Sequence, residues 1–549
     1  MQTVLPAHWK PTLTAVMAVL VLHLVLIQPN HPDAVSWWAL SLFPLELPAI
    51  VLALIALKKN VAGQFFRFGL VALILVIATL KAADFGMFVS LNRGFNLVAD
   101  FPLIVSLYQL ILGALGPLIA ALAVIAAIVG WILVAIAIWW ATGRLLRVNQ
   151  SSQSAICTGF FAVLFTAIAA FEVGATMAKW SSPIELPGTA FTARVGVERA
   201  EQIQETLTQL REFKSAAQAD PFRGNGSYFD QLDRDIYVIF LESYGRTSFD
   251  TPLYAKTHQQ TLAEAAKSLE AAGLSVASTF LTSPTQGGQS WIAHASFANG
   301  LWIDNQTSYQ AALRSGRQTL FHLARQSGFE TVAVMPQITL EWPEAQFMGF
   351  DKIFAAADLS YAGKPFNWVT MPDQFTYAAA DRLLSTDKAV EERLFVQIAT
   401  GSSHAPWVPV PRLLDWDALG DGSIFNEVVE NGVSPRTIWQ DNDRVREQYR
   451  RAVDYALQAA FAYVLRHADS APLVLIIGDH QAASFVSLDD RPHVPMHVIG
   501  PERLVHLIAD DSFTRGLVPS SDSEPWPMSD LRAHLIRSLS SANMSEAQR

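Results

Sequence analysis

The sequence has a single cysteine in 549 residues, Cys157, and it lies in an apolar run. One thiol excludes an intrachain disulfide and a metal cluster held by thiolates. Histidine, aspartate and glutamate therefore remain as the available metal ligands.

Charged side chains are also scarce, at 16% of the chain against about 25% in a typical protein. The deficit is local. Residues 1–180 hold 9 basic and 5 acidic side chains, whereas the rest of the chain holds 30 basic and 44 acidic ones. A net charge of −14 in this second part argues against nucleic acid as a partner.

Long apolar runs fill the charge-poor part of the chain. A helix that crosses a membrane needs about 20 apolar residues. We predict spans at 11–29, 35–57, 68–89, 117–142 and 156–178. Residues 97–116 are a further candidate, because together with the next span they form an apolar run too long for one crossing.

Basic residues between the runs predict the orientation of the chain. Lys58, Lys59 and Arg67 separate the second and third spans, and Arg144 and Arg147 separate the fourth and fifth. Basic loops stay in the cytoplasm, and both loops lie there only if two spans separate them. The further candidate run is therefore predicted not to cross fully. Five spans then predict a multi-pass protein of the cell (inner) membrane whose second part is periplasmic.

Four charged residues lie within or near the predicted spans: Glu46, Lys81, Asp84 and Glu172. Lys81 and Asp84 are one helical turn apart, which predicts that they neutralise each other. We interpret them as a structural pair near the membrane interface.

The second part of the chain alternates β-branched, apolar runs with helical patterns. A polar, helix-like stretch around 196–217 precedes them, and we predict a transmembrane domain, a connector and a globular domain at 1–180, 181–233 and 234–549. The predicted strands are 235–241, 274–280, 330–335, 393–399, 472–477 and 494–499. Helical patterns lie at 257–272, 310–327 and 443–467. This alternation predicts an α/β domain with a mostly parallel sheet, which binds ligands outside the carboxyl ends of its strands.

Acidic residues and histidines stand at the ends of these predicted strands. Glu242 follows the first strand, His404 the fourth and Asp479-His480 the fifth, while His493 precedes the sixth. Each has an ordinary alternative: a helix cap for Glu242, a surface position for His404 and a structural role for His493. Together, oxygen and imidazole donors at successive strand ends predict a divalent metal site, with zinc or manganese as the metal.

A loop rich in hydroxyl groups follows the second predicted strand and has the sequence TQGGQSWIAHASFANG, residues 285–300. A Gly-Gly pair allows close backbone approach, and a helix is predicted from Ser290 to the Asn-Gly stop signal. At such a helix start, the macrodipole and free N–H groups favour an alkoxide and a bound phosphate. The alternatives are that Ser290 is an ordinary N-cap, or that Thr285 or Ser283 is the nucleophile.

These residues, in this order, resemble the alkaline phosphatase superfamily. More narrowly, they resemble its membrane-anchored, sulfatase-like branch, which includes lipoteichoic acid synthases and phosphoethanolamine transferases. The strand-end Glu-Ser of that branch is matched by Glu242-Ser243, its Asp-His pair by Asp479-His480, and the position of its nucleophilic threonine by Ser290.

Two further stretches carry the resemblance: GFD at 349–351 and VPMHVIGP at 494–501. The resemblance covers roughly residues 234–505 and the general layout of the spans. It implies about five transmembrane helices followed by an extracytoplasmic, alkaline-phosphatase-like domain.

Two departures from the branch concern specificity. Sulfatases mature a residue in the motif Cys/Ser-x-Pro-x-Arg, whereas TSPTQGG at 282–288 has no matching arginine. Sulfate-ester hydrolysis by that route is therefore not expected. Trp342 matches a tryptophan that precedes a substrate-binding arginine in lipoteichoic acid synthases, but Pro343-Glu344 follow it here, which leaves phosphoglycerol specificity open.

The resemblance implies a metal-dependent phosphotransferase with a phospholipid donor. Ser290 would attack the head-group phosphorus, of phosphoglycerol or phosphoethanolamine type, and a glycan or lipid acceptor would resolve the covalent intermediate. The implied metal ligands are Glu242, Ser290, Asp479 and His480. A second metal or the substrate is assigned to His404, His493 and Trp342.

Two other functions stay open. A hydrolase of phosphodiesters, phosphomonoesters or sulfate esters would share the first step and use water as the acceptor. A catalytically inactive membrane protein would use the same domain to bind a lipid or a partner, and it predicts that metal ligands are missing.

Overall fold

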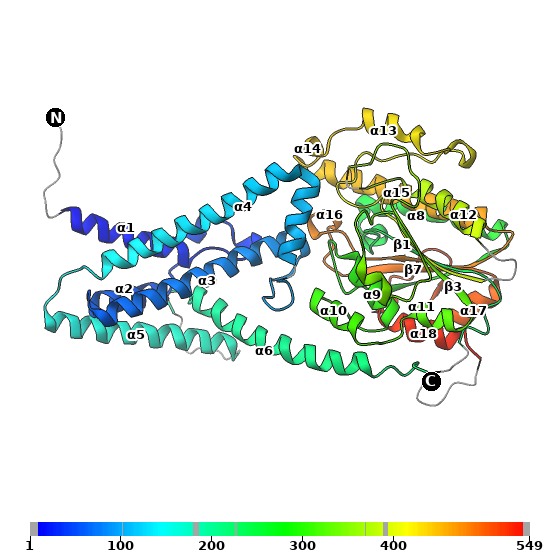
Figure 1. Cartoon of the computed structure of the whole chain (residues 1–549). Coiled ribbons are helices and arrows are strands. Elements are labelled where there is room, and N and C mark those ends of the chain that lie inside the picture. Colours follow the sequence, from blue (N-terminus) through cyan, green and yellow to red (C-terminus); the bar gives the residue numbers. More distant parts are fainter. Residues whose placement is uncertain are drawn as a thin grey trace. The chain divides into compact units, whose positions relative to one another are not determined.

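The computed structural model describes residues 9–101, 103–178, 186–224, 228–367, 369–387 and 393–541. The chain divides into two compact units, an N-terminal unit, Met1–Thr208, and a C-terminal unit, Gln209–Arg549. Figure 1 shows the first as helices in blue to cyan, and the second as a sheet with helices in green to red.

Helices make up the N-terminal unit: α1 (Trp9–Leu26), α2 (Glu46–Leu57), α3 (Val61–Leu91), α4 (Leu103–Leu145), α5 (Ser152–Met177) and the first part of α6 (Phe191–Gln218). Among the described residues, three stretches are long and apolar enough to cross a membrane: Val61–Leu91, Gly116–Leu145 and Ser152–Met177. The chain is therefore a membrane protein.

The predicted span at 35–57 is wrong as a single helix. A 3-10 helix at Trp37–Ser41 occupies its first part, and α2 begins only at Glu46. Just before α2, Pro44 forms a β-bridge with Thr189, and proline has no backbone N–H for a helix. The 12 residues of α2 extend about 18 Å, less than the roughly 30 Å of a bilayer core.

Two other predicted segments differ in length from the structure. The span predicted at 11–29 corresponds to a shorter apolar helix, Thr12–Leu26. Helix α4 is broken at Gly116, whose φ is +81°, directly before Pro117. This break separates the segment predicted at 97–116 from the span that follows it, because proline disfavours helical conformation in the preceding residue.

The first part of α6 holds the buried charges of the N-terminal unit. Asp84 accepts hydrogen bonds from the Arg199 guanidinium, with 2.5 Å between Oδ2 and Nη2. Lys81 Nζ instead donates to the Leu26 carbonyl at 2.9 Å and to Thr192 Oγ1 at 3.1 Å. The prediction that Lys81 and Asp84 neutralise each other is therefore wrong, because α6 supplies a separate partner to each.

A nine-stranded sheet forms the centre of the C-terminal unit, in the order β4-β3-β5-β1-β6-β7-β2-β8, with β9 beside β2. The strands are β1 (Ile236–Leu241), β2 (Ser275–Thr282), β3 (Phe329–Met335), β4 (Lys352–Ala355), β5 (Arg393–Ala399), β6 (Leu473–Gly478), β7 (His493–Gly500), β8 (Thr514–Arg515) and β9 (Trp526–Pro527). The predicted mostly parallel sheet is confirmed, since β4, β3, β5, β1 and β6 are mutually parallel. Strand β7 is antiparallel to both β6 and β2, so β7 starts at the edge where β6 and β2 end.

Helices cover both faces of this sheet (Figure 1). One core contains side chains of α8 (Pro252–Ala271), α12 (Asp373–Asp387) and α15 (Asn442–Arg466). The other contains side chains of α9 (Ser290–Asn299), α10 (Gln306–Arg314), α11 (Leu320–Gln326), α17 (Glu502–Ile508) and α18 (Asp530–Ser538). Short helices lie in the loops: α7 (Thr247–Asp250), α13 (Asn426–Asn431), α14 (Pro435–Ile438) and α16 (Ser484–Ser487). Strand β1 is apolar throughout because alternate side chains enter the two cores.

All six predicted strands are present, with ends that differ by at most two residues. The helix predicted at 310–327 is two helices, α10 and α11, separated around Gly316, whose φ is +71°. Strands β4, β8 and β9 escaped prediction because they are too short, at two to four residues, to show periodicity.

Candidate active site

Three buried ionisable residues meet at the carboxyl ends of two neighbouring strands. Glu242 directly follows β1, and Asp479 and His480 directly follow β6, its parallel neighbour. One ligand atom of each lies within 4.8 Å of the others. The Nε2 atom of His480 is 3.1 Å from Glu242 Oε1 and 3.9 Å from Asp479 Oδ1. We call these residues the acid–histidine cluster.

Gly478 is what allows the two strand ends to approach so closely. A Cβ atom at this position would lie 1.9 Å from the carbonyl oxygen of Tyr244. The next carboxylate then reaches across, and Asp479 Oδ1 accepts from the backbone N–H of Ser243 at 2.9 Å and of His480 at 2.6 Å. The glycine therefore sets the spacing of the cluster.

Ser290 is the first residue of α9 and points at this cluster. Its Oγ donates to Glu242 Oε2 at 2.8 Å and lies 3.3 Å from His480 Nε2. Gln289 occupies the N-cap position, so Ser290 is not the N-cap. The rival hydroxyls are engaged elsewhere: Thr285 Oγ1 donates to the Gly288 carbonyl, and Ser283 Oγ donates to the Asp479 carbonyl.

The backbone around the cluster is strained at residues next to its members. Ser243, beside Glu242, has a φ of +57°, and Gln289, beside Ser290, has a φ of +65°. Non-glycine residues avoid this left-handed region, and such strain of about 1 kcal/mol or more concentrates at functional sites. The two strained residues fix the directions of the carboxylate and the hydroxyl.

A backbone carbonyl sets the tautomer of His480. Its Nδ1 donates to the Gln481 carbonyl at 3.0 Å, which leaves the lone pair of the neutral ring on Nε2. That atom faces both carboxylates of the cluster. Imidazole in this tautomer is the form that binds a metal ion.

The charges of the cluster lack a fixed cation. Burial and the neighbouring Glu242 carboxylate raise the pKa of Asp479 well above its ordinary value. Burial alone would lower the pKa of His480, but the two carboxylates raise it to about 9. Among the described residues, no lysine or arginine pairs with either carboxylate. Without a metal ion, the raised pKa lets His480 carry a proton beside the two carboxylates. A divalent cation would displace that proton, because a metal-binding imidazole is neutral, and would then supply the compensating positive charge.

Comparison with known families agrees with this geometry. Residues 234–504 match the family model described as sulfatase. This part of the chain is a sulfatase-family domain. It is therefore an enzyme domain of the alkaline phosphatase superfamily, as the strand-end residues predicted.

No curated protein sequence matches the chain. Several solved structures are similar to the sulfatase domain. They include the lipoteichoic acid synthase LtaP from Listeria monocytogenes, with 12% identity over 60% of this chain and 78% of that chain and a TM-score of 0.38. The phosphoglycerol transferase GacH from Streptococcus pyogenes, in complex with sn-glycerol-1-phosphate, is 14% identical over 62% of this chain and 82% of that chain, with a TM-score of 0.36. The C-terminal periplasmic domain of EcEptC from Escherichia coli is 13% identical over 59% of this chain and 89% of that chain, with a TM-score of 0.36.

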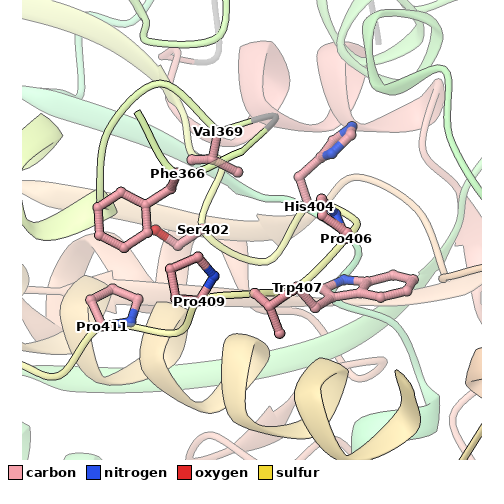
Figure 2. A pocket seen from close by; sticks show the side chains of 9 residues that line it. Phe366, Val369, Ser402, His404, Pro406, Trp407, Pro409 and Pro411 are labelled. Carbon is pink, nitrogen blue, oxygen red and sulfur yellow. The ribbon is translucent and has the colours of Figure 1, made fainter. Parts of the chain in front are cut away.

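His404 follows β5, the other neighbour of β1 in the sulfatase domain. Its Nδ1 donates to the Ala405 carbonyl at 2.6 Å, so its free lone pair is also on Nε2. Figure 2 shows the imidazole pointing away from Phe366 and Pro411, which line a pocket of about 10 Å³ beneath the loop. That volume holds about one water molecule, so the imidazole rather than the pocket is the candidate for ligand contact.

The other two predicted residues, His493 and Trp342, contact described residues outside the acid–histidine cluster. His493 Nδ1 lies 3.5 Å from the Arg246 guanidinium, and burial and this cation lower its pKa. A neighbouring cation disfavours a second metal at His493 and favours an anionic group. Trp342 packs against the core on the α9 side of the sheet, directly before Pro343. That His493 and Trp342 contact the substrate remains a prediction.

The sequence did not single out Asp373, which starts α12 in the sulfatase domain. It is fully buried, and its Oδ1 accepts from the N–H groups of Gly401 and Ser402, both at 2.9 Å. Burial raises its pKa to about 6. Asp373 thus positions the loop that carries His404; the only sequence signal was a Pro-Asp pair at a helix start.

His294 was also missed, one helical turn after Ser290 on α9. Its ring packs against Phe240 with centroids 4.1 Å apart, and its buried Nε2 has no hydrogen-bond partner among the described residues. Burial lowers its pKa to about 4. The neutral ring therefore packs one helical turn behind Ser290, against Phe240.

Proposed function

We propose that this protein is a metal-dependent, membrane-bound phosphotransferase. It moves the head-group phosphate of a phospholipid, of phosphoglycerol or phosphoethanolamine type, to a glycan or lipid acceptor. The observation that carries the proposal is the position of the Ser290 hydroxyl, 2.8 Å from Glu242 and 3.3 Å from His480 at the start of α9. A phosphoserine at residue 290 is the intermediate.

Glu242, Asp479 and His480, together with Ser290 Oγ, would hold a divalent cation, zinc or manganese. When bound, such a cation lowers the pKa of a hydroxyl ligand and offsets negative charge on phosphoryl oxygens. His404 and His493 lie at the same edge of the sheet and would contact the substrate phosphate. Trp342 would contact the group that the phosphate carries.

The residues of the chain supply the rest of the first step. Glu242 Oε2 accepts the proton of Ser290 as the Oγ–P bond forms and the bond from phosphorus to the lipid alcohol breaks. The proton that Glu242 took from Ser290 passes on to the lipid alkoxide, so the lipid leaves as an alcohol and Glu242 is again a carboxylate. The free N–H groups of the first turn of α9 face the phosphoryl oxygens, where a helix start favours negative charge. In the second step, an acceptor hydroxyl attacks phosphorus and the Ser290 Oγ–P bond breaks, while the proton of the acceptor passes through Glu242 to Ser290 Oγ.

The membrane helices and the predicted orientation support a lipid donor. Phospholipid is available within the same membrane, whereas nucleotide triphosphates are absent from the periplasm to which we assign the sulfatase domain. The buried cluster also keeps bulk water away from the nucleophile, which favours transfer to an acceptor over hydrolysis.

The experiment uses the full-length protein with phospholipids labelled in the head group. Mass spectrometry should detect a labelled phosphopeptide that contains Ser290, followed by a labelled acceptor. Ser290→Ala should abolish the phosphopeptide and leave bound metal unchanged, and the matched control Thr285→Ala should retain both. Label on residue 285 would reassign the nucleophile. Release of the free head-group phosphate despite added acceptor would identify a hydrolase, and no turnover of any lipid would favour a binding protein.

A further inference from the structure

A hollow of about 650 Å³ lies at one end of the N-terminal unit, far along the helices from the buried pair of Asp84 and Arg199. It is lined by the start of α1 and the end of α4: Thr12, Thr14, Ala15, Arg144, Arg147, Val148 and Asn149. The described residues of its walls therefore carry hydroxyl, amide and guanidinium groups and no carboxylate.

Positive charge is concentrated at this end of the unit. The end of α4, the loop between α2 and α3 and the second turn of α3 bring five basic side chains here: Lys58, Lys59, Arg67, Arg144 and Arg147. Two contacts show that these segments meet, since Arg67 Nε donates to Thr142 Oγ1 at 3.2 Å and Gln150 Nε2 donates to the Ile55 carbonyl at 2.9 Å.

The carboxylates among residues 1–180 are engaged at the other end of the unit. Each of the five has a partner there: Asp33 with His31, Glu46 with the N–H of Ala193, Asp84 with Arg199, Asp100 with Arg93 and Glu172 with Arg194. The glutamates of α6 lie on the helix that Asp84 and Glu172 contact at that same end. Among the described residues of the N-terminal unit, none of these carboxylates pairs with the basic end, so its arginines are available to an anion from outside the unit.

The two arginines of the hollow are the side chains suited to bind such an anion. Arg67 is already held by Thr142 and lies 3.6 Å above the ring of Trp139. Arg144 and Arg147 are exposed, and neither forms an ion pair within the part of the chain that the structure describes. A guanidinium donates two parallel hydrogen bonds to a phosphate group, which a lysine cannot do.

We propose that this hollow binds the phosphate of an anionic phospholipid head group. The hollow lies at the level of the membrane where lipid head groups are found, because Arg144 is in the last turn of a candidate membrane span, Gly116–Leu145. Apolar side chains of α1 next to the hollow are exposed, with Leu13 at 56% and Val16 at 51%, and they offer contact to acyl chains. Trp140 lies beside Arg144, and tryptophan is typical of the head-group region.

This lipid is not the proposed substrate. The chain leaves the N-terminal unit through α6, whose contacts lie at the acid-containing end with Asp84 and Glu172. The hollow lies at the other end of the helices, where the basic residues predict the cytoplasmic leaflet. The bound lipid thus anchors the start of α1 to the end of α4.

The test measures lipid binding by native mass spectrometry of the full-length, delipidated protein in neutral detergent. Phosphatidylglycerol is titrated against phosphatidylcholine, and inorganic phosphate is added as a competitor. Arg144→Gln/Arg147→Gln should weaken phosphatidylglycerol binding about 30-fold, since each basic residue near an anionic lipid contributes about 1 kcal/mol. The control Lys58→Gln/Lys59→Gln removes the same charge outside the hollow and should weaken it less than about threefold.

Each other outcome overturns the proposal. An equal loss in both double variants would mean that diffuse positive charge attracts the lipid. Equal binding of phosphatidylcholine would remove the requirement for a net anionic head group, and displacement by millimolar inorganic phosphate would identify a site for free phosphate. Arg144→Lys/Arg147→Lys keeps the charge and the fold and should give an intermediate loss of phosphatidylglycerol binding. Unchanged binding would exclude a role for the two parallel hydrogen bonds of a guanidinium.

Discussion

The two units of this protein bury charge in different ways. In the N-terminal unit, Asp84 and Asp100 are fully buried, and each is bound by an arginine of the same unit. In the C-terminal unit, Glu242 and Asp479 are also buried, but among the described residues their partners are His480, backbone N–H groups and the hydroxyls of Ser243 and Ser290, and no lysine or arginine. A buried charge is tolerated only when it is compensated. The comparison therefore distinguishes carboxylates that are paired with arginines of the chain from carboxylates of the acid–histidine cluster, which we propose to be compensated by a metal ion.

The largest effect is expected from Asp479→Asn, which removes one carboxylate from the acid–histidine cluster. We expect bound metal to be lost and turnover to fall on the order of 10³-fold or more, because the nucleophile loses its activation. Metal analysis and phosphoryl transfer on the same preparation measure both. Asp373→Asn, at a buried carboxylate outside the cluster, is the matched control and should retain the metal. Full metal content in Asp479→Asn would remove Asp479 from the ligand set.

Arg199→Leu breaks the corresponding pair in the N-terminal unit. Asp84 would stay buried without its cation, which typically costs about 3 to 5 kcal/mol. The apparent unfolding midpoint in detergent should fall accordingly, while metal content and turnover per folded molecule stay the same. Asp84→Asn/Arg199→Gln should recover part of the loss. Lys364→Leu breaks an exposed pair with Glu430 and should change stability by less than about 1 kcal/mol. A selective loss of metal in Arg199→Leu would contradict the comparison.

Asp373 sharpens the comparison, because it is buried without either a cation or a ligand role. Its pKa is raised from 3.8 to about 6, so the folded state binds the proton more tightly than the unfolded state. Stability contributed by this proton is present below pH 4 and is lost as the pH rises through 6. Asp373→Asn keeps the Oδ1 acceptor and should stabilise the protein by about 3 kcal/mol at pH 8 and by little at pH 4. Unfolding midpoints of both proteins across this range measure it; a constant difference would refute the assignment.

The smallest effect is expected at Gly300, which ends α9 with a φ of +62°. A Cβ here would lie 3.0 Å from Arg532 Cδ, and Arg532 forms a buried pair with Asp220 at 2.9 Å. Gly300→Ala should cost about 1 kcal/mol through the left-handed backbone, because the flexible arginine stem can shift. Chemical denaturation measures this, with the exposed Gly273→Ala, also at positive φ, as the control for backbone strain alone. A loss above about 4 kcal/mol would show that the pair is rigid.

The sequence was sufficient for the six longer strands of the sheet and for the strand ends at which the candidate ligands lie. Buried parallel strands are continuous apolar runs, and polar residues directly after such runs, as at Glu242 and Asp479, must lie at one edge of the sheet. The start of α9 followed from the Gly-Gly pair and the Asn-Gly stop. Whether Ser290 is the nucleophile stays a prediction, although the structure turns its hydroxyl toward the cluster.

What could not be predicted depends on partners distant in the sequence. Lys81 and Asp84 suggested a local pair, but their partners Thr192 and Arg199 lie more than 100 residues later, on a helix whose docking has no local signal. Asp373 escaped notice for the same reason, because it binds Gly401 and Ser402. The segment 35–57 is apolar enough for a span, but its composition does not show that Pro44 pairs with Thr189 and that the helix begins only after it.

The reversed strand β7 gives the loop between β6 and β7 an unusual position. This single connection leaves the sheet at Asp479 and His480 and returns to the same edge at His493. Residues within it are tied together through Gln481, whose Nε2 donates to the carbonyls of Asp489 and Arg491. A graft between residues 482 and 492 would therefore exchange one wall of the site as a module while both strands stay in register.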